Sequence, residues 1–77
     1  MPRYFFDIHD GIEFSDPNGT ELSDHSAARI RAVSLATDHA KMPAMLNQDG
    51  GVVIVNVRDN AGGRPIEIRL AFTGADG

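Results

Sequence analysis

Hydrophobic and polar positions alternate every second residue in several stretches of the chain, and this period is typical of β-strands. Residues 3–9 alternate in this way, residues 12–14 return after a short turn, and residues 66–72 alternate again near the other end. Residues 52–58 are apolar except for Asn56 and Arg58, a pattern typical of a strand buried on both faces. The pattern therefore predicts four strands.

The segments between these strands carry turn residues. Asp10-Gly11 predicts a two-residue hairpin turn in which both residues have positive φ. The segment 16–19 (D-P-N-G) predicts a second turn, because proline fixes φ at its own position and glycine can adopt the left-handed conformation. A third turn is expected at the glycine-rich segment 59–63.

Between the second and third strands the hydrophobic period changes to that of a helix. Ser23 or Asp24 is a suitable N-cap, because a short side-chain oxygen can accept from the first free backbone N–H groups. The amphipathic helix is expected to run for about five turns. It should end near Lys41 or Met42, ahead of Pro43.

The element order β-β-α-β-β indicates an α+β fold: an antiparallel sheet of two hairpins with one helix packed on one face. We expect residues 1–77 to form a single small domain, with residues 73–77 as a frayed tail. The core is expected to combine one face of the first and last predicted strands with the helix alanines and two larger helix residues. These positions are Tyr4, Phe6 and Ile8 or their neighbours, with Ile66, Ile68, Leu70, Phe72, Val33 and Leu35.

Composition narrows the class of protein. A hydrophobic fraction of 42% is too high for a disordered chain, and the lack of cysteine excludes disulfides and thiolate metal ligands. The apolar run near the N-terminus is too short for a signal peptide, and the longest run elsewhere, Val52 to Val55, is too short to span a bilayer. These features predict a soluble cytoplasmic protein.

The charge pattern bears on possible partners. The net charge is -4, and the first 25 residues hold six acidic residues against one arginine. Nucleic-acid binding is normally driven by a basic face, so we expect no nucleic-acid partner and no membrane partner. The alternative is base stacking on the aromatic residues 4–6 beside Arg58, Arg64 and Arg69.

Candidate metal sites are sparse. Asp7, His9, Asp10 and Glu13 form the one cluster of acidic residues and histidine, but no third or fourth ligand is fixed by the pattern. His25 and His39 lie fourteen residues apart on the expected helix, about 21 Å, which is too far to share an ion. Asp16, Asn18 and Glu21 lack the further oxygen ligands of a calcium loop. We therefore expect no metal and no cofactor.

Nucleophilic catalysis requires a nucleophile, a base and an orienting group held together. The serines of the chain (Ser15, Ser23, Ser26 and Ser34) have no histidine partner that the sequence places beside them. A chain this short also has little room for a substrate pocket of about 300 Å³. We therefore expect no enzyme and no catalytic residues.

A second apolar face is expected on the sheet, opposite the helix. Phe5, Val52 and Ile54 point to that face, and soluble monomers seldom leave such a patch bare. A second copy is the expected cover, because symmetric dimers are the commonest oligomers. The alternative is that Val52 and Ile54 pack under the segment 42–46.

Several short motifs resemble a family of short bacterial proteins that are grouped only as a domain of unknown function. They are the opening M-P-R-Y-F-F, the H-D-G step at 9–11, the D-P-N-G-T-E-L segment at 16–22 and the A-A-R helix start at 27–29. The resemblance implies a small stand-alone α+β domain without known catalytic residues. Together with the expected dimer it predicts an interaction or regulatory module that acts through self-association or a protein partner. The alternative is a module linked to nucleic acid or similar to an antitoxin.

Overall fold

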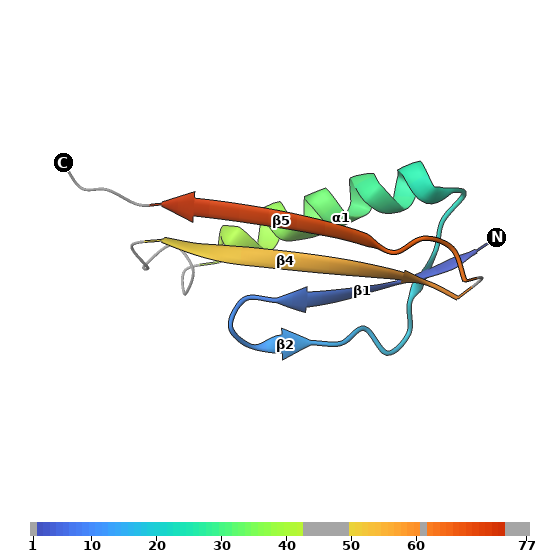
Figure 1. Cartoon of the computed structure of the whole chain (residues 1–77), viewed down its shortest axis with the longest axis horizontal. Coiled ribbons are helices and arrows are strands. Elements are labelled where there is room, and N and C mark those ends of the chain that lie inside the picture. The colour runs from blue at the N-terminus through green and yellow to red at the C-terminus, as the bar shows by residue number, and fades with distance from the viewer. Residues whose placement is uncertain (1, 43–49, 61, 74–77) are drawn as a thin grey trace.

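The sheet and helix were determined in a computed structural model that describes residues 2–42, 50–60 and 62–73. In chain order the elements are β1 (Arg3–His9), β2 (Glu13–Phe14), β3 (Thr20–Glu21), α1 (His25–Ala40), β4 (Gly50–Asp59) and β5 (Ile66–Thr73). The strands form one antiparallel sheet in the order β2-β1-β4-β5, with β3 also paired to β1, and α1 covers one face (Figure 1). The predicted α+β class is confirmed, with one short strand more than expected.

The additional strand, β3, continues the line of β2 along the same edge of β1. Ile8 pairs with Phe14, so an unbroken ladder would place Tyr4 opposite Asn18, but Tyr4 pairs with Thr20, two residues further on. The segment between β2 and β3 takes up those two residues as the predicted turn, with a positive φ of 74° at its glycine. A strand of two residues has no period, so the sequence pattern did not reveal it.

The prediction of a two-residue turn at Asp10-Gly11 is wrong. His9 pairs with Glu13, so the loop also includes Ile12, and of its three residues only Gly11 has positive φ. The Asp10 carboxylate accepts a hydrogen bond from the Ile12 N–H at 3.1 Å, and the Asp10 N–H donates to the Ile12 carbonyl. Because this side chain closes the turn, Asp10 does not need the left-handed conformation.

The helix begins as predicted. Asp24 is the N-cap, and its carboxylate accepts a hydrogen bond from the Ala27 N–H at 2.8 Å. The last helical residue is Ala40 and Lys41 is the C-cap, in agreement with the predicted end near Lys41 or Met42. In the described part of the chain no helix is long and apolar enough to cross a membrane.

The core lies between α1 and the sheet face beneath it. Val53 and Val55 are fully buried at the centre of β4, and Ala28 and Ala32 bring the helix backbone close to them. The remaining core residues are Tyr4, Phe6, Ala36, Val57 and Ile66. The other predicted core residues, Ile8, Leu35, Ile68, Leu70 and Phe72, are half-buried against this cluster.

One predicted core residue is placed wrongly. Val33 is 47% exposed, whereas its neighbour Ala32 is fully buried. Successive helix residues are about 100° apart, so Val33 turns to the flank of the helix when Ala32 faces the sheet. At the end of the chain Thr73 is the last residue of β5, and the rest of the expected tail lies outside the described residues.

Candidate functional site

An ion pair joins two strands on the face of the sheet that the helix leaves uncovered. Arg58 on β4 donates to both carboxylate oxygens of Asp7 on β1, from Nε at 2.7 Å and from the terminal nitrogen at 3.1 Å. Its guanidinium carbon also lies 5.1 Å from the ring centroid of Phe5. These hydrogen bonds hold the pKa of Asp7 below its ordinary value, so the carboxylate stays ionised beside the arginine.

The turn between β2 and β3 is held by a second carboxylate next to this ion pair. One oxygen of Asp16 accepts from the N–H groups of Gly19 and Asn18 at 3.0 and 3.1 Å, and the other accepts from the Phe6 N–H at 3.2 Å. The Gly19 N–H contributes most to lowering the pKa of Asp16. The Asp16 N–H in turn donates to Asp7 at 3.0 Å, so the turn and the ion pair form one network.

This network also accounts for the residues that faintly resembled a calcium loop. The oxygens of Asp16 accept backbone N–H groups, and Glu21 forms an ion pair with Arg3 at 3.3 Å. Arg3 also donates to the backbone carbonyl of Asn18 at 2.8 Å. These hydrogen bonds and this ion pair therefore stabilise the turn.

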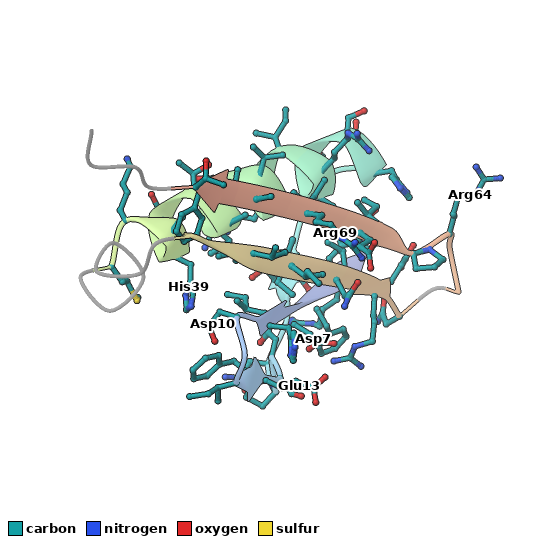
Figure 2. All side chains as sticks on the ribbon, turned by 60° about the vertical axis from the view of Figure 1, so that its left-hand side comes forward. Asp7, Asp10, Glu13, His39, Arg64 and Arg69 are labelled. Atoms are coloured by element: carbon teal, nitrogen blue, oxygen red, sulfur yellow. The ribbon has the colours of Figure 1, made fainter. Side chains whose placement is uncertain are left out.

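A second polar contact lies on the helix side, just after the C-terminal end of β1. Nε2 of His39, in the last turn of α1, pairs with a carboxylate oxygen of Asp10 in the hairpin loop, and the two side chains are only 11% and 14% exposed. Figure 2 shows the two side chains pointing toward one another. The hydrogen bond with His39 is the main cause of the lowered pKa of Asp10. The ring of Phe14 lies edge-on to His39, with centroids 5.9 Å apart.

The structure separates the acidic residues and histidine that the sequence placed in one cluster. Asp7 points to the helix-free face and pairs with Arg58, whereas Asp10 pairs with His39 on the helix side. His9 and Glu13 are both exposed. Within the described ranges no group of three or more histidine, aspartate or glutamate residues could hold a metal ion.

The three arginines of the base-stacking alternative, Arg58, Arg64 and Arg69, have different surroundings. Arg58 is engaged with Asp7, and Arg69 forms an ion pair with Glu67 at 3.6 Å. Arg64, in the segment that leads into β5, points away from the other labelled side chains (Figure 2). The aromatic rings nearby are not accessible for base stacking either. Tyr4 and Phe6 are 3% and 5% exposed, and Arg58 lies over the ring of Phe5.

Phe5, Val52 and Ile54, the expected interaction surface, all lie on the helix-free face. They do not form one continuous patch, because Phe5 pairs with Arg58 and Ile54 pairs with His9, while Asp7 and Asn56 lie between them. Val52, at 41% exposure, is the most open of the three. The alternative, in which Val52 and Ile54 pack under the segment 42–46, involves residues outside the described ones.

Other large hydrophobic side chains are more exposed than this face. Ile30 and Val33 on the helix are 71% and 47% exposed. Around the hairpin Ile12 is 67% exposed and Phe14 is 47% exposed. Sequence reasoning missed both groups, since it assigned Val33 to the core and Ile12 to a strand. The signal was present in the helical spacing, which makes Ile30 and Val33 neighbours on the helix surface away from the buried alanines.

Comparison with known proteins gave one family. A family model described as Domain of unknown function (DUF6894) matches residues 3–71. No curated protein and no solved structure matches the chain. The matched region includes both polar contacts and every element from β1 to most of β5.

Proposed function

The chain belongs to the DUF6894 family, a domain of unknown function. From its exposed hydrophobic side chains we propose that it is a protein-interaction module that works by self-association. The role is non-catalytic, because the carboxylates of Asp7, Asp10 and Asp16 are engaged in contacts that hold the turns and the sheet together.

The exposed hydrophobic surface carries this proposal. One helix covers one face of a five-stranded sheet, and six large hydrophobic side chains of the described residues are at least 41% exposed. These side chains are Ile12, Phe14, Ile30, Val33, Met42 and Val52. Neighbouring exposed apolar side chains, such as Ile30 and Val33 on the helix, are common at protein interfaces and unfavourable in water. A symmetric dimer would bury the same surface of both copies.

Nucleic acid is the weaker alternative. The net charge of -4 repels phosphate, and two of the three arginines around β4 and β5 are already paired with acidic residues. The stacking mode would need an uncovered aromatic ring, but the guanidinium of Arg58 lies over the ring of Phe5. A protein partner of the same sequence fits this surface better.

Sedimentation equilibrium over a range of concentrations up to tens of micromolar tests the proposal. The weight-average mass should rise from near 8.3 kDa towards twice that value as the concentration increases. A mass that stays near 8.3 kDa throughout would overturn self-association. The same experiment at high salt serves as a control, since an interface based on apolar contact should persist when exposed charges are screened.

A further inference from the structure

The strand β5 forms a long, regular edge of the sheet. It pairs with β4 without a break in register, from Val57 opposite Ile66 to Gly50 opposite Thr73, and it is the last strand in the sheet order. The opposite edge differs, because β2 and β3 are only two residues long and the segment 15–19 interrupts them. No proline or lysine lies within β5. A straight edge of this kind is a template for a further strand.

The side chains of β5 on the helix side are incompletely covered. Ile66 is 6% exposed, but Ile68, Leu70 and Phe72 are only half-buried, whereas Val53 of the neighbouring strand is fully buried. The helix packs mainly on β4 and β5 and only slightly on β1, so it already lies toward this edge (Figure 1). Among the described residues, the side of β5 away from β4 is where a second molecule could cover these side chains further.

The flank of the helix above that edge is apolar as well. Val33 and His39 lie on opposite sides of the line of buried alanines, given about 100° per residue. Because His39 reaches Asp10, beyond β1, Val33 is turned toward the side of β5. Ile30, one helical turn before Val33, is 71% exposed and lies next to Val33 on the helix surface, further from the sheet. The free strand edge and an apolar helix surface are thus adjacent.

We propose that two copies of this chain pair antiparallel through β5, which forms one continuous sheet with both helices on the same face. This inference rests on the proposed self-association and specifies its surface. With strands about 4.8 Å apart and α1 above β4 and β5, the two helix axes would lie about 10 Å apart. That separation is near the 8–10 Å at which helices pack. Val33 would then face Val33 of the second copy, with Ile30 at the outer margin of that contact.

The charged residues of β5 favour one register for the pairing of the two β5 strands. When Ile68 faces Ile68 of the partner subunit, Glu67 faces Arg69 of the partner subunit, and the reciprocal pair forms as well. A register centred on Arg69 would oppose two arginines, and one centred on Glu67 would oppose two glutamates. Opposite charges directly across an antiparallel pair stabilise it, and like charges destabilise it. Glu67 and Arg69 are both exposed, so they are free to exchange their present contact for these pairs.

A charge-swap series tests this register by sedimentation equilibrium. Arg69→Glu converts two attractive cross-strand pairs into repulsive ones and should raise the dimer dissociation constant by roughly tenfold or more. The double variant with Glu67→Arg and Arg69→Glu should restore the wild-type constant. Circular dichroism checks that each variant is folded. If the double variant binds as weakly as the single one, the register is overturned.

A second series separates the β5 edge from the helix-free face. Val33→Glu should weaken the dimer, whereas Ser34→Glu, which adds the same charge one residue further on at an exposed helix position, should not. Ile54→Lys, on the opposite face of the sheet, should leave the dimer intact. Loss of the dimer in Ile54→Lys but not in Val33→Glu would overturn the edge interface while keeping self-association. A wild-type chain that is monomeric throughout would instead refute the proposed function itself.

Discussion

Replacing Gly19 by alanine should destabilise the protein by more than the backbone conformation alone explains. Gly19 has a φ of 74°, and a Cβ atom there would lie 2.8 Å from Cγ of Arg3 and 3.0 Å from Cε1 of Phe5. Neither neighbour can move freely, since Arg3 is hydrogen-bonded to the carbonyl of Asn18 and Arg58 lies over the ring of Phe5. The substitution therefore combines unfavourable φ with overpacking.

Gly62 provides a matched control, because its φ is 80° and a Cβ atom added there would meet nothing within 4 Å. Gly62→Ala should cost about 1–2 kcal/mol, the penalty for an L-residue in the left-handed region. Gly19→Ala should cost about 1–3 kcal/mol more because of the close contacts. Each kcal/mol corresponds to a fall of about 4–8 °C in melting temperature for a domain of this size.

Thermal and urea unfolding, followed by circular dichroism, measure both variants against the wild type. Equal losses of stability in the two variants would refute the reasoning, because they would mean that Arg3 and Phe5 yield to the added methyl group without penalty. The measurement should be made at one low concentration, since any dimerisation would add a concentration-dependent contribution to the apparent stability.

Three further predictions can be tested with the same protein. The pKa values of Asp7, Asp10 and Asp16 are held below the ordinary value, so the stability that these groups contribute is present above about pH 4 and is lost as the pH falls further. The free energy of unfolding in urea should therefore stay constant as the pH falls from 7 to about 4 and then decline towards pH 2. Ala32→Leu should destabilise the fold by about 1–3 kcal/mol in the same assay, because Ala32 is fully buried against the sheet; an unchanged midpoint would show that the helix can lift without penalty. Fluorescence anisotropy should detect no binding to random single-stranded or duplex nucleic acid tighter than about 100 μM at physiological salt, and a salt-dependent curve at low micromolar concentration would contradict this.

Local sequence signals located most of the secondary structure. Period-two alternation placed β1 at residues 3–9 and β5 from residue 66, and both boundaries agree with the structure to within one residue. The side-chain oxygen of Asp24 identified the helix start, because an N-cap acts within its own turn. These features depend on neighbouring residues alone, so the sequence is sufficient to predict them.

The polar contacts could not be derived in the same way. Asp10 and His39 are 29 residues apart, and Asp7 and Arg58 are 51 apart. Each contact depends on which strands become neighbours and on where the helix ends over the sheet. The pattern predicted two hairpins but did not indicate that β1 and β4 form the centre of the sheet. Without that order, Asp7 and Asp10 seemed to share one site.

The exposed apolar side chains of the helix could not be predicted from the sequence either. A helix with small residues on one side has a narrow buried stripe, and the sequence pattern does not define its width. Ala28 and Ala32 fill the space above the sheet, which leaves Val33 on the flank. A position of Val33 on the flank of the helix would have predicted an exposed apolar surface there in addition to the one expected on the helix-free face.

Amide hydrogen exchange along β5, measured at a dilute and a concentrated protein solution, tests the edge pairing most directly. Alternate residues of Ile66–Thr73 direct their N–H groups to β4 and away from it. The paired set should be protected at both concentrations. The outward set should exchange fast in dilute solution and gain protection in concentrated solution, as the second copy supplies carbonyl acceptors. Exchange of the outward amides that is fast and independent of concentration, in a sample shown to be dimeric, would contradict pairing through β5.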